Sequence, residues 1–395
     1  MSHNEDSQLK VKKVKNISRE IKPATERMLW GVSAGMCEFA GCCNLLYSHH
    51  ITKEKVNLSE KAHIYAFSAG GKRPSLLRFS PKINDIDNLM LVCERCHKLI
   101  DSEDTDYTAE QLLEMKKEHE ERVRILASIK PDLQSEIVIY NANIADNTIR
   151  ISDFAAKSAI IPDHYPAREI PINLSPDLSL FDNEKAYWSV MATHLERQWA
   201  QYSPVVRDKH ISLFAVAPQP LLFKLGTLIN RNYSVNVMQS QGSIDNWKWR
   251  CDKQTAEIVT QRIDAKDPDA EPIITFELTA KLSLDELEKG FGEGTKYRIT
   301  TQNCGPEVIK SWRDLRAVID EYRKVLNQIR EANSQVSKVK LVPIAPCSVS
   351  IEAGRKTMKG DPAIMLYDRN YITKKWTHAL TLNGKEEEVC IPKNS

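Results

Sequence analysis

Apolar and polar residues alternate in two different ways along this chain, and the change between them divides it. Up to about residue 130 the apolar runs are short, and a long polar stretch separates Asn57 from Asn88. This part ends in a predicted helix at 107–126, where Thr108 and Gln111 have capping-box spacing. Pro131 interrupts the helical pattern, so we place a domain boundary there.

The rest of the chain alternates β-like runs with longer amphipathic segments. Strands are predicted at 136–140, 211–216, 235–239, 273–282, 296–301, 339–344 and 363–367, and helices at 183–202 and 311–332. Such alternation indicates an α/β architecture. We therefore expect a first domain over 1–130, a connecting segment over 131–165 and a larger domain over 166–395.

An internal repeat supports this interpretation. Residues 211–239 and 339–367 share the order strand, Ala-Pro, short helix with a glycine, second strand. A constant offset of 128 aligns Ala217-Pro218 with Ala345-Pro346, and Gly226 with Gly354. We interpret the copies as two Rossmann-like units whose proline loops lie at the carboxyl ends of strands, where ligands bind in open α/β sheets. The alternative is that both are ordinary core strand-turn-helix units.

Composition narrows the cellular setting. The chain has 395 residues, 42% of them apolar, which suits two or three domains. Neither a signal-peptide run nor eighteen consecutive apolar residues occur, so we expect a cytoplasmic protein with no membrane segment. In a reducing cytosol the nine cysteines are thiols or metal ligands, and c-type haem attachment at Cys93-x-x-Cys96-His97 is disfavoured.

Charge is unevenly distributed, although the formal net charge is only +2. Residues 10–82 contain 14 Lys and Arg against 5 Glu and no Asp. A local excess of this kind suits contact with a phosphate backbone, and equally a solvated surface.

Two cysteine pairs predict a structural metal site in the first domain. Cys37 and Cys42 are separated by some fifty residues from Cys93 and Cys96. Four thiolates around one ion form a closed Zn²⁺ site, which would clamp a loop-rich domain. Cys43 is an alternative to Cys42, because the sequence does not indicate which of the two points inward.

If the cysteines fill the zinc shell, His97 is available for other chemistry. Asp101 follows His97 by one helical turn, and this pair can hold a divalent cation with open positions for phosphate and water. Upstream lie His63 and Asn88, which gives the order His, Asn, His. His49 and His50 are outside this pattern and are interpreted as solvated or structural residues, and His119 is interpreted as a surface residue.

The residues from Met36 to His119 resemble an HNH endonuclease domain with a zinc knuckle. The resemblance implies a ββα-metal fold and an enzyme that hydrolyses phosphodiesters, with His63 as general base and Asn88 either holding the base-bearing loop in place or orienting His63. His97, supported by Asp101, would carry Mg²⁺ or a similar cation. One departure is Ala62, where many family members have another ligand; Glu60 or water could complete the shell.

The duplicated segments resemble the two CARF-like halves of a SAVED domain, and the domain order resembles the nuclease effectors of bacterial CBASS antiphage systems. This implies a fold of mixed class, α+β in the first domain and α/β in the second, and a DNA endonuclease activated by a cyclic di- or trinucleotide. Candidate ligand contacts are Gln219, Lys224, Trp247, Trp249, Arg250, Ser348, Arg355, Tyr367, Arg369 and Trp376. For each of these, a core or surface role is the competing interpretation.

The resemblance also implies regulation by assembly. A single metal site cuts one strand of double-stranded DNA at a time, so we expect a homo-oligomer whose order increases on activation. The main alternative is a zinc-stabilised nucleic-acid-binding regulator whose α/β domain senses a metabolite. A third interpretation is an HNH nuclease that acts on RNA.

Overall fold

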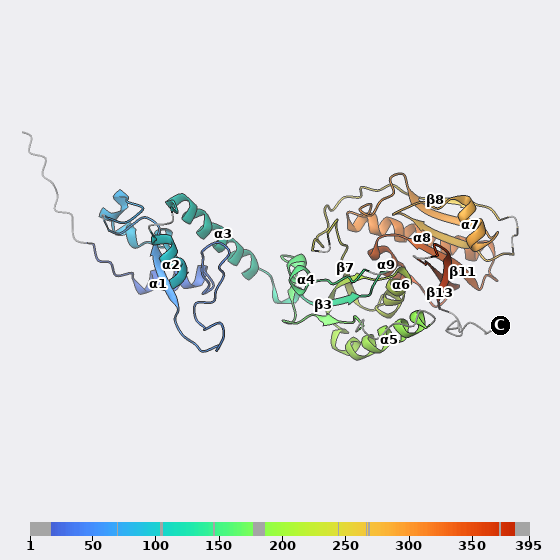
Figure 1. Cartoon of the computed structure of the whole chain (residues 1–395), viewed down its shortest axis with the longest axis horizontal. Helices are drawn as coiled ribbons and strands as arrows, with labels where there is room; N and C mark the ends of the chain where they lie inside the picture. Colours follow the sequence, from blue (N-terminus) through green and yellow to red (C-terminus); the bar gives the residue numbers. More distant parts are fainter. Residues whose placement is uncertain are drawn as a thin grey trace, which may run out of the picture. The chain divides into compact units, whose positions relative to one another are not determined.

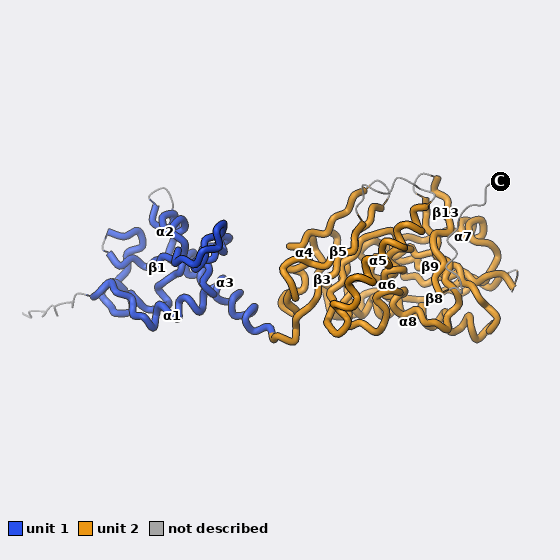
Figure 2. Tube along the Cα trace, turned by 90° about the horizontal axis from the view of Figure 1, so that it is seen from below, with its two compact units in different colours: residues 1–129 blue, residues 130–395 orange. Residues whose placement is uncertain are grey.

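The computed structural model describes residues 17–68, 70–102, 106–144, 147–176, 186–243, 245–265, 267, 269–370 and 373–383. The chain divides into two compact units, and the boundary in the sequence lies between Ile129 and Lys130 (Figure 2). Among the described residues, no helix is both long enough and apolar enough to cross a membrane.

The first unit is built around two antiparallel strands and the helix that follows them (Figure 1). Its elements are α1 (Pro23–Val32), β1 (Ser59–His63), the 3₁₀ turns η1 (Leu76–Phe79), η2 (Pro81–Asn84) and η3 (Ile86–Asn88), β2 (Leu89–Cys93), α2 (Glu94–Asp101) and α3 (Ala109–Ala127). In the pairing of β1 with β2, His63 lies opposite Leu89. The loop that closes this pair is ordered by the three 3₁₀ turns in succession.

Helix α3 begins as the sequence predicts. The Thr108 hydroxyl accepts from the Gln111 backbone and the Gln111 side chain accepts from the Thr108 backbone. Leu112 packs into the core shared with β1 and β2. The interpretation of His119 is wrong in one respect, because it is 6% exposed and its Nε2 lies 3.0 Å from the Ser33 carbonyl oxygen. It is a buried structural residue between α3 and the end of α1.

The second unit contains two mainly parallel sheets. The first has the order β4-β3-β6-β7, with β5 also paired to β3, and the second has the order β13-β12-β11-β9-β10-β8. The strands are β3 (Gln134–Asn141), β4 (Tyr165–Pro166), β5 (Ile172–Asn173), β6 (His210–Val216), β7 (Ser234–Val237), β8 (Ile258–Ile263), β9 (Ile273–Glu277), β10 (Lys296–Thr301), β11 (Lys338–Ile344), β12 (Ala363–Arg369) and β13 (Trp376–Leu382). The helices are η4 (Pro131–Leu133), α4 (Asp153–Ile160), α5 (Tyr187–Val206), α6 (Gln219–Leu228), α7 (Leu284–Phe291), α8 (Trp312–Ala332) and α9 (Cys347–Lys356).

The connecting segment expected at 131–165 belongs to this unit. Strand β3 lies within that segment, and seven of its eight residues are buried. It pairs in parallel with β6 along most of its length. The segment is therefore part of the sheet rather than a linker, and the second unit begins directly after α3.

The internal repeat corresponds to two equivalent halves. Strand, helix and strand β6-α6-β7 in the first half match β11-α9-β12 in the second, and each set follows a long helix, α5 or α8. Helices α6 and α9 cross in close contact at Gly226 and Gly354. A Cβ on Gly226 would lie 2.1 Å from the Ile351 carbonyl oxygen, and one on Gly354 would lie 2.1 Å from that of Phe223. Only residues without a side chain allow this approach of the two backbones.

Candidate functional site

Four cysteine thiols cluster in the first unit. The Sγ atoms of Cys37, Cys42, Cys93 and Cys96 all lie within 4.8 Å of one another. The Sγ atoms of Cys42 and Cys93 are 3.9 Å apart, and tetrahedral Zn–S bonds of about 2.3 Å place sulfurs about 3.8 Å apart. The donor set therefore fits Zn²⁺.

Cys42, rather than Cys43, belongs to the cluster. Cys43 has a left-handed φ of 48°. The Cys43 thiol is exposed and accepts from Arg122 at 3.2 Å. Within the cluster, burial raises the pKa of the Cys37 thiol to about 12. A cation is thus needed to hold four thiolates in this place.

His63 is placed at the end of β1 with a defined hydrogen bond. Its Nε2 lies 3.0 Å from Asn84 Oδ1, while Asn84 Nδ2 donates to the Ser18 carbonyl at 2.8 Å. Because the amide nitrogen is committed to Ser18, the amide oxygen accepts a hydrogen bond from the Nε2–H group, and Nδ1 keeps the free lone pair. Burial lowers the pKa of His63 below its ordinary value, although the bond with Asn84 opposes this. The ring is therefore held neutral near pH 7 with Nδ1 as its basic atom.

Asn88 is buried and holds the chain that follows His63. Its Oδ1 accepts from the Tyr65 backbone at 2.8 Å, and its Nδ2 donates to the carbonyls of Tyr65 and Ile83 at 3.1 and 2.9 Å. All its polar groups are used within the protein, and the residue is 3% exposed. Asn88 thus fixes the loop that follows His63.

His97 and Asp101 lie one turn apart on α2. His97 Nε2 and Asp101 Oδ2 are 3.8 Å apart, and both side chains are partly exposed. Two such donors can share one divalent cation and leave positions open. Arg73 Nη2 lies 3.5 Å from the His63 carbonyl oxygen and 3.0 Å from Asp101 Oδ1, which places the end of β1 beside this pair.

Ala62 and Glu60 do not extend this set. Ala62 is 3% exposed and packs into the core. Side chains alternate along a strand, so Glu60 shares the face of Ala62 while His63 faces the other way. Glu60 therefore faces away from His63 and does not complete the metal shell, which leaves water as the remaining candidate.

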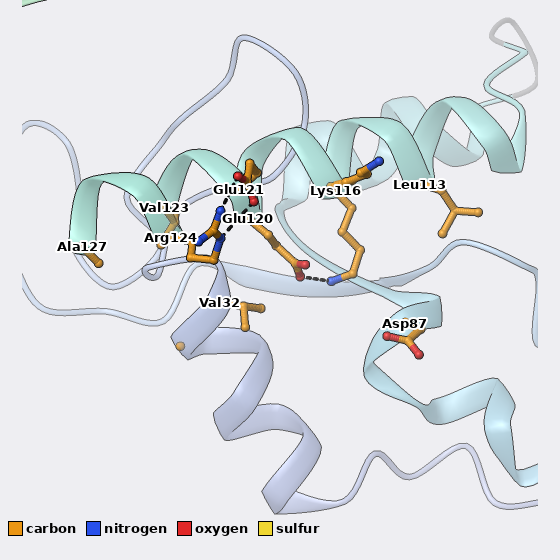
Figure 3. A pocket seen from close by; sticks show the side chains of 11 residues that line it. Val32, Asp87, Leu113, Lys116, Glu120, Glu121, Val123, Arg124 and Ala127 are labelled. Carbon is orange, nitrogen blue, oxygen red and sulfur yellow. Dashed lines mark hydrogen bonds and ion pairs between the residues drawn. The ribbon is translucent and has the colours of Figure 1, made fainter. Parts of the chain in front are cut away.

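A separate hollow of the first unit lies elsewhere. It is a groove of about 680 Å³ between α1 and α3, where Lys116 pairs with Glu120 and Arg124 pairs with Glu121 (Figure 3). None of His63, His97 or the clustered cysteines lines it. The groove is not part of the candidate catalytic site.

In the second unit, the two halves meet at the carboxyl ends of their strands. Gln219, which begins α6, donates to the Ala345 carbonyl at 2.8 Å, and the Ser348 backbone donates to Gln239 at 3.1 Å. The Ser348 hydroxyl is fully buried and has no hydrogen-bond partner among the described residues. The amino-terminal ends of α6 and α9 are thus joined in one edge that contains an unsatisfied donor.

The same edge extends to the end of β10. A polar hollow of about 610 Å³ is lined there by Thr301, Gln302, Asn303 and Glu307, among others. Arg250 lies beside it, since its guanidinium pairs with Glu307 at 2.7 Å. The sequence did not indicate this hollow, because its polar residues belong to a loop without periodicity.

Three of the candidate ligand contacts are structural residues. Trp247 is 1% exposed and packs edge-on against Phe214. Lys224 is buried in an ion pair with Glu196. The buried Arg355 donates to the carbonyls of Ile229 and Tyr233. In this conformation the Trp247 ring is covered, and the charged groups of Lys224 and Arg355 are bound within the protein, so none of the three is available to a ligand.

The remaining candidates occupy two other places. Trp249 packs against Trp312 with ring centroids 5.2 Å apart. Tyr367 and Arg369 lie on β12, and Trp376 lies on β13. Tyr367 and Trp376 contact Phe291 of helix α7, and Arg369 lies near Glu286 of the same helix. Thus Gln219, Ser348 and Arg250 lie along the carboxyl edge, and the others do not converge with them.

Comparison with known proteins gives the second unit its family. Residues 195–382 match the family described as the SMODS-associated and fused to various effectors sensor domain, SAVED. This stretch is a SAVED domain. Its two equivalent halves meet at the joined carboxyl edge described above.

Solved structures of SAVED receptors are only distantly similar to this chain. A Cap4 SAVED/CARF-domain containing receptor of Acinetobacter baumannii with the cyclic trinucleotide 2'3'3'-cAAA has 13% identity and a TM-score of 0.43, over 71% of this chain and 63% of that chain. The corresponding receptor of Moraxella osloensis has 12% identity and a TM-score of 0.39, over 79% of this chain and 70% of that chain. This chain thus spans less than two thirds of the length of the Acinetobacter receptor. No curated protein matches the sequence.

Proposed function

We propose that this protein is a metal-dependent HNH endonuclease that cuts double-stranded DNA when its SAVED domain binds a cyclic oligonucleotide, as a CBASS effector in bacterial antiphage defence. The observation that carries the proposal is the group formed by His63, His97 and Asp101. A neutral imidazole with a fixed tautomer stands near two potential metal ligands, on a ββα unit clamped by four cysteines. Because that unit is joined to a SAVED domain, a ligand bound by the SAVED domain would control DNA cleavage.

In this proposal His63 is the general base. Its Nδ1 accepts a proton from the attacking water, and the positive charge that develops on the ring is offset by Asp101, whose carboxylate favours the protonated form. Asn84 keeps Nε2 as a donor throughout, so the ring does not lose its orientation during proton transfer.

His97 and Asp101 would hold the catalytic Mg²⁺ or a similar cation, which would stabilise negative charge on the phosphate and the leaving oxygen. The cysteine cluster would hold Zn²⁺ and has no role in the chemistry, because its four donors close the shell. The basic residues of 10–82 provide a sequence-independent attraction to DNA.

The activator is assigned to the carboxyl edge of the SAVED domain. Helix α9 directs its positive amino-terminal end to this edge beside the unsatisfied Ser348 hydroxyl, an arrangement suited to phosphate. The receptor from Acinetobacter baumannii carries a cyclic trinucleotide, and a ligand of this class would contact both halves. Activation requires that the ligand bind an active assembly of several copies more tightly than the idle form.

The test is plasmid cleavage in Mg²⁺ with the full chain and a panel of cyclic dinucleotides together with 2'3'3'-cAAA and 3'3'3'-cAAA. We expect cleavage with one member of the panel and none after His63→Ala. His50→Ala is the matched control, because His50 is an exposed imidazole of the same unit. Ligand-independent cutting would remove the sensor half of the proposal. Binding of DNA without any His63-dependent cutting would instead favour the zinc-stabilised regulator, and cutting of RNA alone would favour an RNA nuclease.

A further inference from the structure

Arg73 is a buried arginine in the loop between β1 and β2. It is 8% exposed, although this loop is otherwise polar and largely accessible. The loop is folded back around it, since the Ala66 backbone donates to the Arg73 carbonyl at 2.8 Å. Burying a guanidinium costs free energy unless its donors find partners, so its contacts explain why it is there.

One side of the guanidinium contacts the end of the strand that carries the proposed base. Arg73 Nε donates to the Ile64 carbonyl at 2.7 Å, and Nη2 lies 3.5 Å from the His63 carbonyl. Asn88 holds the same segment from the other direction, because the Ile64 backbone donates to its carbonyl at 2.9 Å. The backbone at His63 is therefore restrained by two separate groups.

The other side contacts the end of helix α2. Nη1 donates to the Ile100 carbonyl at 3.1 Å, and Nη2 donates to Asp101 Oδ1 at 3.0 Å. The second oxygen of Asp101 remains directed toward His97. Arg73 thus decides which carboxylate oxygen of Asp101 is available to a cation.

These contacts join the end of β1 to the end of α2, which are separated in the sequence by the whole loop. The guanidinium is planar and its donors diverge at fixed angles, so one side chain can set the separation of a strand end and a helix end. Lysine would provide the charge but could not reproduce this divergent set of bonds.

We infer that Arg73 is a positioning residue that fixes the distance between the general base on β1 and the metal ligands on α2. The inference rests on the proposed nuclease function. Arg73 touches neither the DNA nor the cation; it acts through the His63 and Ile64 carbonyls and through Asp101.

A purely structural role is the competing explanation, and it makes a different prediction. If Arg73 only stabilised the fold, then the fully folded fraction of a variant would cut at the normal rate. If it positions the base relative to the metal ligands, folded protein would still be slow, since misplacement by about 1 Å can cost about 100-fold in rate. DNA affinity would be preserved in the second case.

The experiment compares Arg73→Gln and Arg73→Lys with Lys82→Gln, using the full chain with its activating cyclic nucleotide. Lys82 is an exposed cation of the same loop, so its variant controls for loss of charge near DNA. The single-turnover cleavage rate at saturating DNA and the DNA dissociation constant without Mg²⁺ are measured at a temperature where each variant is folded and retains one zinc. Arg73→Lys keeps the test informative if Arg73→Gln does not fold.

We expect Arg73→Gln to slow cleavage about 100-fold and Arg73→Lys at least about 10-fold, with DNA dissociation constants within about 3-fold of Lys82→Gln. Folded, zinc-loaded variants that cut within about 3-fold of the unmodified protein would overturn the inference and leave the nuclease proposal intact. Absence of His63-dependent cutting in the unmodified protein would overturn both.

Discussion

The tautomer and burial of His63 predict how cleavage depends on pH. The neutral ring is the active form, because only then does Nδ1 carry a lone pair. Burial lowers the pKa of His63, so neutral base is present above this lowered value and is lost as the pH falls through it. We expect the acid limb of the cleavage rate to have its midpoint below about 6.5, the ordinary value for histidine.

The measurement is the single-turnover rate between pH 5 and 8 at saturating DNA, Mg²⁺ and activating nucleotide. Asn84→Ala is the informative variant, because it removes the acceptor that fixes the tautomer without adding a charge. We expect it to slow cleavage about 10-fold or more across this range. An acid limb centred above 6.5 in the unmodified protein would contradict the assignment of His63 as a buried base.

Adjacent Cys42 and Cys43 provide a sharp test of the zinc site. Cys42→Ser removes one of four clustered thiols, whereas Cys43→Ser changes an exposed side chain that only contacts Arg122. We expect one zinc per chain in the unmodified protein and in Cys43→Ser, and less than one in Cys42→Ser, measured by elemental analysis after purification. Equal zinc content in both variants would show that the cluster does not bind the ion as four thiolates.

At the residue scale, spacing predicted that the four cysteines converge, but not which groups hold His63 in place. His63, Asn88, His97 and the cysteine pairs are recognisable because the chemistry requires particular residue types at particular intervals. Asn84 and Arg73 act through contacts across a loop of irregular structure, where no periodicity links them to His63. His119 was placed on a solvated face because the helical pattern describes one helix alone, and α1 covers a second face of α3.

Among the elements, the crossing of α6 and α9 is the most restrictive contact. Gly226→Ala or Gly354→Ala would force a methyl group against a backbone carbonyl, and we expect each to destabilise the second unit by about 2 kcal/mol or more. Gly290→Ala is the matched control, because Gly290 also lies in a helix and its nearest neighbour is a Trp376 ring atom at 3.8 Å.

Thermal and urea unfolding of the full chain would measure this effect. Gly290→Ala should be neutral or slightly stabilising, since alanine favours helix by about 1 kcal/mol over glycine. If the Gly226 and Gly354 variants behaved like Gly290→Ala, then the close helix contact would not exist in solution.

The alternation of elements was predictable, whereas their ends depended on tertiary contacts. Strand β9 was expected over 273–282 but ends at Glu277. The buried Glu277 carboxylate receives two bonds from Arg298 and one from the Leu282 backbone, which folds the apolar residues after it back toward the sheet. An apolar run has the same appearance before and after such a turn, so the sequence pattern alone could not place the end of the strand.

For the whole molecule, the division into two units predicts two separable unfolding transitions. We expect the stability of the first unit to depend on the metal held by its thiol cluster, and the stability of the second unit to depend on its own two sheets. A chelator that removes zinc should lower the midpoint of one transition and leave the other within about 2 °C. A cyclic nucleotide at 100 times its dissociation constant should stabilise only the other, by about 2.7 kcal/mol.

Differential scanning calorimetry of the full chain can assign these transitions, with Cys42→Ser marking the first unit and Gly226→Ala the second. A single transition that responds to both chelator and nucleotide would contradict independent units. The sequence could indicate two domains through composition and repeat. It contains no periodic signal for how ligand binding to the second unit would act on the proposed nuclease, because that would depend on assembly.

The contact between Asn84 and the chain before α1 has a consequence for how firmly the proposed base, His63, is held in its reactive orientation. Asn84 donates to the carbonyls of Ser18 and Glu20 at 2.8 and 3.5 Å, and these residues belong to neither helix nor strand. Such segments open at low free-energy cost. Whenever this one lifts away, Asn84 can rotate, and the imidazole is no longer held with its basic nitrogen exposed to water. A tag or a proteolytic cut just ahead of Pro23 would thus reduce the fraction of competent molecules while strand, helix and metal ligands stayed in place.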